Sequence, residues 1–306
     1  MARLTVATCQ FPVDAGIERN CRYVMRQMRS AKDRGADIAH FPEACLSGYA
    51  GADFEDHSEF DWELLESAML RVMGLAAELR LWVVLGSAHR LTGQHKPHNS
   101  LYVIDDTGTL VDRYDKRFCS GDPGGRTGDL AHYTPGDHPV VFTVGGVRCG
   151  TLICYDFRFP ELYREYKRLG VQLVLHSFHA GHAPPAKIAA IREAIGEDVL
   201  HLNTADTYPG ILMPATMTAQ AGANHVWISC PNSSARESLW GAFFVRADGI
   251  TTGRLPRNRA AVLISTVDTE QPLYDSTAHW RARAMDGVLN SGTPVPDPRS
   301  ADRTSL

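Results

Sequence analysis

Short apolar segments alternate with helical patterns over the first 85 residues, and this alternation most limits the fold that the chain can adopt. The apolar runs are typical of strands, and the stretches between them repeat apolar residues at helical spacing. Farther along, apolar runs separated by turns that contain Gly predict β-hairpins. The patterns predict strands at 3–9, 37–41, 81–85, 100–105, 109–115, 140–144 and 147–153, and helices at 17–31 and 59–80. This combination predicts a mixed β-sheet with helices on its outside.

The rest of the chain continues the pattern, and no linker divides it. We expect strands at 171–176, 225–230, 240–247 and 260–267, and helices at 160–169 and 186–201. Residues 1–267 are therefore expected to form one domain. Residues 268–306 contain four prolines, and we expect this tail to pack on the domain or on a partner subunit.

Charge and cysteine content exclude several classes of protein. The formal net charge of -4 argues against a nucleic-acid-binding protein and against a polybasic membrane binder. The chain has no run of eighteen apolar residues, so we expect no membrane-spanning helix. Seven cysteines without a recognisable secretion signal predict free thiols and a cytoplasmic location.

Two ionisable side chains lie where predicted strands end. Glu43 follows the strand over 37–41, and Lys116 follows the strand over 109–115. Strand ends deliver functional groups to clefts, so both residues are candidates for chemistry. Each also has a plainer interpretation, in which Glu43 is a solvated residue at the start of a loop and Lys116 is a surface lysine.

The segment Cys149-Gly-Thr-Leu-Ile-Cys-Tyr-Asp-Phe-Arg-Phe-Pro-Glu-Leu162 is the strongest candidate to carry a nucleophile. An apolar strand runs into Cys154, and a turn then leads to a helix that Pro160 opens. Backbone N–H groups at such an elbow favour a thiolate, which is the nucleophilic form of cysteine. The plainer interpretation is a buried cysteine that continues the strand. Cys149, in mid-strand, fits that interpretation better than Cys154 does.

Together these segments resemble the nitrilase, or carbon–nitrogen hydrolase, superfamily. The resemblance rests on Glu43 in a Pro-Glu to Gly-Tyr context, on Lys116 after a strand, and on Cys154 in Gly-x-x-x-Cys-Tyr-Asp-x-Arg-Phe-Pro-Glu. It covers about residues 3–267, and the three motifs together are far more specific than any one of them. It implies an α/β fold, a four-layer α-β-β-α sandwich with two mixed sheets. It also implies a Glu–Lys–Cys triad, no cofactor, and a homodimer or larger homo-oligomer.

The resemblance assigns a role to each residue of the triad. Cys154 would attack a planar carbon bonded to nitrogen, Glu43 would take the thiol proton and later activate water, and Lys116 would stabilise the oxyanion. The backbone N–H of Tyr155 would be a second oxyanion donor. The expected enzyme is a thiol amidohydrolase that cleaves a small amide through a thioester and releases ammonia or an amine.

The residues after the nucleophile bear on the substrate. Cys-Tyr-Asp resembles amidases and carbamoyl-amide hydrolases, whereas true nitrilases typically have Cys-Trp-Glu. A small amide or carbamoyl compound is therefore the expected binding partner, ahead of a nitrile. An N-carbamoyl hydrolase or a nitrilase on the same triad remains an alternative. A non-catalytic member that binds small molecules is an alternative of another class, and the intact triad argues against it.

Further residues are assigned to the site. Many amidases of the family have a second Glu in the loop after the lysine. The matching residue here is Asp129, one methylene shorter, for which we expect a supporting role. Arg158 is expected either to bind a substrate carboxylate through a bidentate contact or to form a structural pair with Glu161. His179 and Tyr49 are expected to face the substrate.

Two features of the stretch after 176 affect the interpretation. The three histidines of His176-Ser-Phe-His-Ala-Gly-His182 suggest zinc, but their spacing matches no standard signature, and we expect no metal. Residues 179–217 are longer than the corresponding stretch in simple family members. We expect this insertion to form a lid or a pocket wall on which substrate choice depends.

Overall fold

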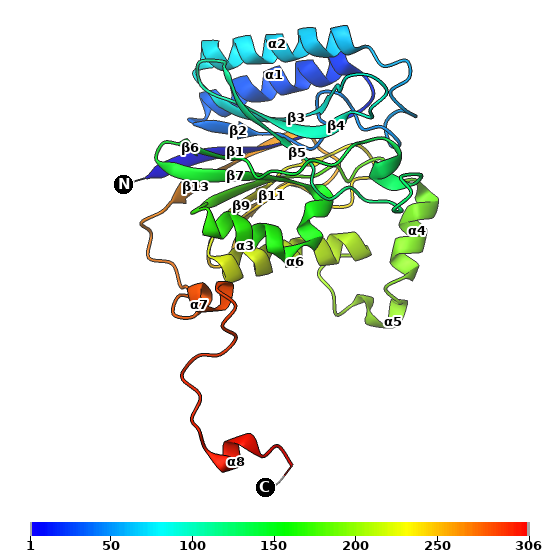
Figure 1. Ribbon diagram of the computed structural model, residues 1–306. Helices are drawn as coiled ribbons and strands as arrows, with labels where there is room; N and C mark the ends of the chain where they lie inside the picture. The colour runs from blue at the N-terminus through cyan, green and yellow to red at the C-terminus, as the bar shows by residue number, and fades with distance from the viewer. Residues whose placement is uncertain (1, 305–306) are drawn as a thin grey trace.

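The computed structural model describes residues 2–304, in which two β-sheets pack face to face between two layers of helices (Figure 1). Each sheet contains both parallel and antiparallel pairs of strands. The expected four-layer α-β-β-α sandwich with two mixed sheets is confirmed.

The first sheet has seven strands in the order β10-β1-β2-β3-β4-β5, with β13 also paired to β1. β1, β2 and β3 are parallel, whereas β3-β4 and β4-β5 are antiparallel. Its strands are β1 (Arg3–Phe11), β2 (Ile38–His40), β3 (Trp82–His89), β4 (His98–Ile104), β5 (Leu110–Asp115), β10 (Asn232–Ser233) and β13 (Ala261–Asp268). The antiparallel pairing of β13 with β1 joins the two ends of the domain.

The second sheet has six strands in the order β12-β11-β9-β8-β7-β6. β7, β8 and β9 are parallel, and the flanking pairs are antiparallel. Its strands are β6 (Val141–Val144), β7 (Val147–Ile153), β8 (Leu173–Ser177), β9 (Trp227–Cys230), β11 (Phe243–Val245) and β12 (Thr251–Arg254). The sequence analysis missed β10 and β12 because the first has two residues and the second, Thr-Thr-Gly-Arg, has no apolar periodicity.

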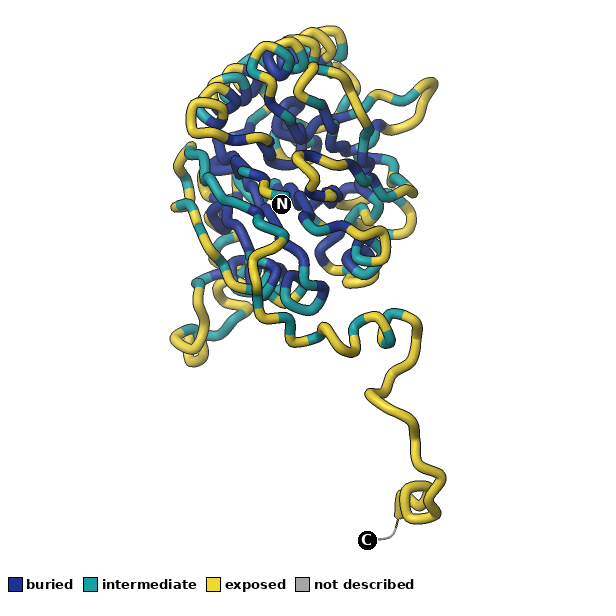
Figure 2. Tube along the Cα trace, turned by 90° about the vertical axis from the view of Figure 1, so that its left-hand side faces the viewer, coloured by how far each residue is buried: buried dark blue, intermediate teal, exposed yellow. Residues whose placement is uncertain are grey.

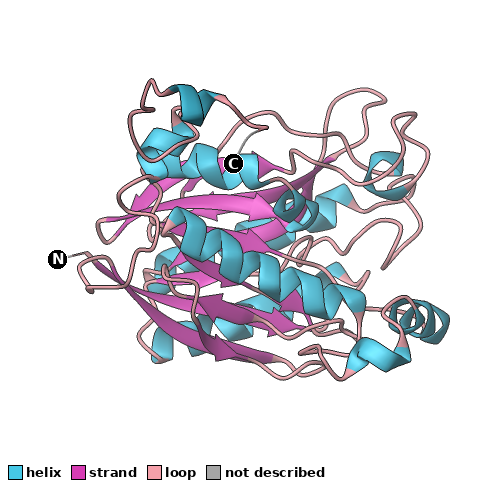
Figure 3. Cartoon of the chain, turned by 90° about the horizontal axis from the view of Figure 1, so that it is seen from below, coloured by secondary structure: helices cyan, strands magenta, loops and turns pink. Residues whose placement is uncertain are grey.

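Helices cover the outer face of each sheet. α1 (Ile17–Asp33) and α2 (Trp62–Leu79) lie over the first sheet, and α3 (Pro160–Arg168) and α6 (Tyr208–Asn224) lie over the second (Figure 1; Figure 3 shows helices over strands from below). One apolar core lies between α1, α2 and the first sheet, and the other fills the space between the sheets and beneath α3 and α6. No helix that the structure describes has the length and apolar character needed to cross a membrane.

The stretch after the second sheet's β8 differs from expectation. The single helix predicted over 186–201 is wrong, because the chain breaks it at Gly196, which has a φ of 85°. It forms α4 (Pro185–Glu193) and the short α5 (Glu197–Leu200), neither of which buries a residue. α6 belongs to the helix layer and buries Met213 and Met217, so only the residues before it project from the sandwich.

The C-terminal tail leaves the sandwich after β13 and carries α7 (Arg281–Met285) and α8 (Pro298–Ala301). The Thr277 hydroxyl donates to the Ala223 carbonyl of α6 at 3.2 Å, which holds the first part of the tail against the domain. The last part extends away from the body and is exposed (Figures 1 and 2). The domain boundary at 267 and packing of the tail on a partner subunit stay predictions.

Candidate active site

Glu43, Lys116 and Cys154 come together, although they follow strands of different sheets. Glu43 lies just beyond β2 and Lys116 directly follows β5, both in the first sheet, whereas Cys154 directly follows β7 in the second. Lys116 Nζ donates a hydrogen bond to Glu43 Oε1 at 2.8 Å, and both side chains interact electrostatically with the Cys154 thiol. The Glu43 and Lys116 side chains are buried, and Cys154 is partly exposed.

The Glu43 carboxylate is oriented by contacts from both sheets. Its backbone N–H donates to the Phe178 carbonyl, just beyond β8, at 3.3 Å, and the chain turns at Ala44, which has a φ of 51°. Asn99 Nδ2, from β4, donates to Glu43 Oε1 at 2.8 Å, the oxygen that also accepts from Lys116. Glu43 Oε2 is buried and makes no hydrogen bond to a nitrogen or oxygen atom of the described residues, and the Glu43 carboxylate interacts with the Cys154 thiol.

Asp129 reaches the lysine in spite of its short side chain. The 3₁₀ turn η1 (Gly128–Ala131) brings Asp129 Oδ2 to 2.7 Å from Lys116 Nζ. The Tyr49 hydroxyl donates a short hydrogen bond to Asp129 Oδ1, and the Ser120 N–H donates to Oδ2 at 3.0 Å. The loop therefore comes close enough for an aspartate to touch the lysine, and its supporting role in catalysis stays a prediction.

The surrounding carboxylates keep Lys116 charged. Burial alone would lower the pKa of Lys116, but Glu43 and the other neighbouring groups, Tyr49, Cys154 and Asp129, together outweigh burial, and the net pKa lies well above the usual value. In the same way, burial would raise the pKa of Asp129, but the Lys116 ammonium holds it below its usual value. A buried ammonium is therefore present beside Cys154.

Cys154 lies at a strained turn that the buried Asp156 carboxylate holds in place. Cys154 has a φ of 39°, a left-handed conformation unusual for a residue with a side chain, and it opens the 3₁₀ turn η2 (Cys154–Arg158). Burial raises the pKa of Asp156 to about 6. The carboxylate accepts three hydrogen bonds, from Ile153 N–H at 2.9 Å, Phe118 N–H at 2.9 Å and the Tyr114 hydroxyl at 2.8 Å. These bonds tie the elbow to β5 and to the loop after it.

The surroundings of Cys154 favour the thiol over the thiolate. Desolvation raises the pKa of Cys154 most, the Glu43 and Asp129 carboxylates raise it further, and Lys116 lowers it, with a net pKa well above the usual value. The backbone N–H groups at the elbow would favour the thiolate, whereas burial and the two carboxylates favour the thiol. A base must remove the proton before the sulfur can attack.

Cys149 behaves as a core residue. It is fully buried in the middle of β7, and burial raises the pKa of its thiol to about 12. All seven cysteines are free in the structure. The plainer interpretation therefore holds for Cys149, and the two cysteines of the segment occupy distinct environments.

Tyr155 and Arg158 lie on the exposed side of the elbow. The Tyr155 ring packs edge to face against Phe159, with ring centroids 5.8 Å apart, and its backbone directly follows the nucleophile candidate. Arg158 is exposed, and its Cζ lies 4.6 Å from the centroid of the Phe157 ring. The structure does not bring the Arg158 side chain into the buried cluster around Lys116. The substrate-binding role of Arg158 and the oxyanion role of Tyr155 stay predictions.

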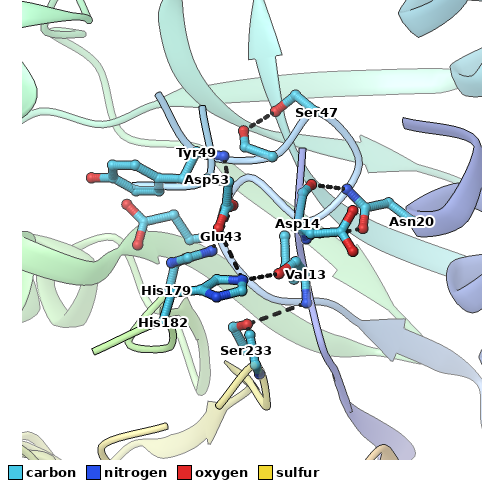
Figure 4. Close-up of polar contacts among 12 residues, drawn as sticks. Val13, Asp14, Asn20, Glu43, Ser47, Tyr49, Asp53, His179, His182 and Ser233 are labelled. Carbon is cyan, nitrogen blue, oxygen red and sulfur yellow. Dashed lines mark hydrogen bonds and ion pairs between the residues drawn. The ribbon is translucent and has the colours of Figure 1, made fainter. Parts of the chain in front are cut away.

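Tyr49 and His179 lie side by side next to Glu43 (Figure 4). Their ring centroids are 5.1 Å apart, and the Tyr49 hydroxyl is 3.4 Å from Lys116 Nζ. His179 Nε2 lies 3.0 Å from Asp53 Oδ2. Burial would lower the pKa of His179, but the Asp53 carboxylate together with the Glu43 carboxylate outweighs burial, and the net pKa is raised. Both residues therefore border the three-residue cluster.

The histidines of the 176–182 segment have separate surroundings. His176 Nδ1 hydrogen-bonds the Tyr163 hydroxyl at 2.7 Å, and its Nε2 lies 3.2 Å from the Cys154 carbonyl oxygen. His179 and His182 instead approach Asp53. No group of three or more His, Cys, Asp or Glu side chains within residues 2–304 is placed to hold a metal ion.

The sequence analysis missed three side chains that shape the cluster: Asp53, Asn99 and Asp156. Asp156 had a local signal, since it lies two residues beyond Cys154 in the same elbow. Asn99 is one polar residue in an ordinary hairpin strand, and Asp53 lies in an irregular acidic loop. For neither residue does the surrounding sequence indicate a place in the site.

Comparison with known proteins agrees with this geometry. A model of the carbon-nitrogen hydrolase family matches residues 5–272. The chain is 29% identical over 160 residues to the hydrolase in the agr operon of Staphylococcus lugdunensis, covering 51% of this chain and 63% of that protein. It is 28% identical over 179 residues to an omega-amidase of Xenopus tropicalis, covering 58% and 63%. The match thus spans less than two thirds of either relative.

A solved structure has the same fold over nearly the whole chain. An amidase from Nesterenkonia sp. superposes with a TM-score of 0.70 at 22% sequence identity, covering 94% of this chain and 96% of that one. A cysteine-to-alanine mutant of that amidase has been solved in complex with butyramide. A glutamate-to-glutamine mutant shows covalent addition of the acetamide moiety of fluoroacetamide at the active-site cysteine.

Proposed function

Because the chain belongs to the carbon-nitrogen hydrolase family, we propose that it is a thiol amidohydrolase that cleaves a small amide with Glu43, Lys116 and Cys154. The observation that carries the proposal is the 2.8 Å contact of Lys116 with Glu43 beside the Cys154 thiol. A thiol with a raised pKa needs a base, and a buried glutamate with one unpartnered oxygen can supply it. An ammonium in the same place can stabilise an oxyanion.

The first half-reaction forms a thioester. Glu43 takes the thiol proton as the Cys154 sulfur bonds to the amide carbonyl carbon, and the carbonyl oxygen becomes an oxyanion. The Lys116 ammonium and the backbone N–H of Tyr155 donate to that oxygen, and one such donor contributes on the order of a hundredfold to a thousandfold in rate. The intermediate collapses as Glu43 gives its proton to the amide nitrogen. The C–N bond breaks, and ammonia or an amine leaves.

The second half-reaction consumes water and restores the thiol. Glu43, again ionised, takes a proton from water as the water oxygen bonds to the thioester carbon. The tetrahedral intermediate expels the Cys154 sulfur, which recovers its proton from Glu43, and the acid product leaves. One carboxylate thus acts twice as base and twice as acid, in alternation, which suits a group held in place by Asn99 and Lys116.

Asp129 and Tyr49 support Lys116 in this scheme. The Asp129 carboxylate at 2.7 Å and the Tyr49 hydroxyl at 3.4 Å fix the position of Lys116 Nζ, so that the ammonium needs no rearrangement when the oxyanion forms. Their contacts are also the reason that the lysine can remain buried and charged.

Carbamoyl compounds are the second substrate class that the same triad can serve. They present a planar carbon bonded to nitrogen, as amides do. The N-carbamoylputrescine amidase of Solanum tuberosum is 26% identical to this chain over 185 residues, covering 59% of this chain and 60% of that protein. We rank simple amides and ω-amides first, carbamoyl compounds second and nitriles third.

Ammonia release across a panel of small amides, ω-amides, carbamoyl compounds and nitriles tests the proposal. The wild-type protein is expected to release ammonia from at least one amide, and rapid acid quench followed by intact-mass measurement should detect an acyl group on Cys154. Cys149→Ala is the matched control, because it changes a buried cysteine of the same segment. An acyl group retained on a Cys154→Ala protein would contradict the proposal.

A further inference from the structure

The Asp53 carboxylate, which the mechanism above does not use, lies at the centre of a second polar cluster beside the triad (Figure 4). Its side chain is fully buried. Asp53 Oδ2 accepts a hydrogen bond from the Tyr49 backbone N–H at 2.9 Å and lies 3.0 Å from His179 Nε2. Asp53 Oδ1 lies 3.4 Å from His182 Nε2. A buried carboxylate is costly unless such partners compensate it, so the position calls for an explanation.

The contact with Tyr49 connects Asp53 to the lysine. The carboxylate fixes the backbone of Tyr49, whose hydroxyl donates to Asp129 and lies 3.4 Å from Lys116 Nζ. The Tyr49 ring also packs edge to face against Tyr133, with centroids 5.6 Å apart. A shift of the Tyr49 backbone would therefore move a group that touches both Lys116 and Asp129.

The contact with His179 connects Asp53 to the glutamate. His179 lies beside the Tyr49 ring and interacts electrostatically with Glu43. The groups that face this imidazole are the Asp53 and Glu43 carboxylates and the Tyr49 ring, with His182 on the far side of Asp53. Both carboxylates favour the imidazolium form of His179, so its charge state is coupled to Asp53 and to Glu43.

The contact with His182 extends the cluster to the projecting segment. His182 Nε2 also hydrogen-bonds the Val13 carbonyl at 2.9 Å, and α4 begins three residues later at Pro185. Asp53 thus contacts the loop from which the segment with α4 and α5 departs.

We propose that Asp53 is a positioning residue of this active site. It fixes Tyr49 and His179 as one wall of the substrate pocket, and through them it keeps Lys116 and Glu43 in their relative positions. The inference rests on the proposed function. It adds a residue that contacts no member of the triad and acts through two that border it. The role requires the negative charge as well as the hydrogen bonds, because an amide oxygen could accept from the same two donors but would not attract an imidazolium as a carboxylate does.

Asp53→Asn tests the proposal, with Asp56→Asn as the matched control. Asp56 lies three residues away in the same loop and is exposed. A misplacement of about 1 Å at a catalytic group can cost on the order of a hundredfold in rate. We expect Asp53→Asn to lower kcat/KM for an amide by roughly tenfold to a hundredfold. Asp56→Asn should leave it unchanged.

The titration midpoint of His179 is a second readout. If Asp53 had only a structural role, its substitution would leave this midpoint unchanged. The titration would be followed in histidine-labelled protein, and the signal of His179 would be assigned with the His179→Gln variant. Asp53→Asn should lower the titration midpoint of His179 by about one pH unit or more, because it removes an opposite charge. A normal kcat/KM in Asp53→Asn overturns the proposal. So does a loss of activity accompanied by a lower Tm and an unchanged His179 midpoint. If Asp53→Asn does not fold, His179→Gln tests the same pair, and unchanged kcat/KM in that variant overturns it.

The alkylation rate of Cys154 separates this inference from the proposed function. Iodoacetamide reports the geometry and protonation of the thiol without any substrate. If the wild-type protein hydrolyses no compound of the panel, the proposed function fails. In that case, a Cys154 alkylation rate that differs from wild type in Asp53→Asn but not in Asp56→Asn would still support the positioning role. Equal rates in all three proteins would overturn it.

Discussion

Gly86 in β3 is the point where the backbone that carries Glu43 approaches the sheet most closely. A Cβ built on Gly86 would lie 2.2 Å from the Pro42 carbonyl oxygen and 2.6 Å from the Ala44 nitrogen, and real Cβ atoms essentially never come within 3.0 Å of such atoms. The atoms in the way belong to the backbone on either side of Glu43, so they cannot rotate aside. Gly86→Ala must therefore push this segment away from β3.

The size of the effect follows from these distances. The segment must move by about 0.8 Å, the difference between 2.2 Å and 3.0 Å, to relieve the closest contact. A displacement of about 1 Å at a reacting group costs on the order of a hundredfold in rate. Overpacking also costs about 1–3 kcal/mol of stability. We expect kcat/KM of Gly86→Ala to fall by roughly a hundredfold per folded molecule.

Gly74→Ala in α2 is the matched control for this prediction, because a Cβ at Gly74 meets nothing within 4 Å. In a helix the same substitution stabilises by about 0.5–1 kcal/mol. Ammonia release would be measured at a temperature at which circular dichroism shows both variants to be folded. If Gly86→Ala is folded and retains more than half of the wild-type kcat/KM, the argument that Gly86 sets the position of Glu43 is refuted.

The remaining predictions concern the residues of the cluster. Cys154→Ala should abolish turnover without unfolding the protein, and iodoacetamide should label Cys154 in preference to the buried Cys149; mass mapping of the label that shows the reverse would disprove the assignment. Glu43→Gln and Lys116→Ala should each lower kcat by several orders of magnitude, and the double variant should be little worse, as kinetics of the three variants would show. Since the Glu43 carboxylate raises the pKa of Cys154, Glu43→Gln should lower it, and alkylation of Cys154 measured against pH should then begin at lower pH; an unshifted profile argues against their contact. If Arg158 binds a substrate carboxylate, Arg158→Lys should reduce the ratio of kcat/KM for an amide-bearing acid to that for its neutral analogue, whereas a structural role would change Tm and leave the ratio intact.

Local signals predicted the longer strands and helices, whereas the resemblance to a known family implied the four layers and the meeting of Glu43, Lys116 and Cys154. Apolar periodicity defines the longer strands and helices, and each of the three residues directly follows a strand or lies just beyond one. The resemblance to a known family then implied two mixed sheets, and the order of the strands within each sheet was not predicted. Within such a framework, residues at the ends of neighbouring strands have few places to lie.

Contacts between loops could not be predicted in this way. Asp53 and His179 are 126 residues apart, and the loops that carry them have no periodicity to fix their course. The break at Gly196 was equally hidden, since a glycine inside a helix costs only about 1 kcal/mol and does not by itself end one. The protonation of Cys154 depends on burial and on the Glu43 and Asp129 carboxylates, which are distant in sequence.

Under the proposed function, the division of Glu43, Lys116 and Cys154 between the two sheets has a consequence for how the protein acquires reactivity. Glu43 and Lys116 belong to the N-terminal half of the chain and Cys154 to the C-terminal half, while β10 and β13 return from the second half to complete the first sheet. A chain emerging from the ribosome thus exposes base and ammonium before the thiol is made. The thiol contacts them only when the two halves of the chain associate, so neither half alone is expected to be active. Turnover recovered on mixing two separate fragments would show that they complement each other.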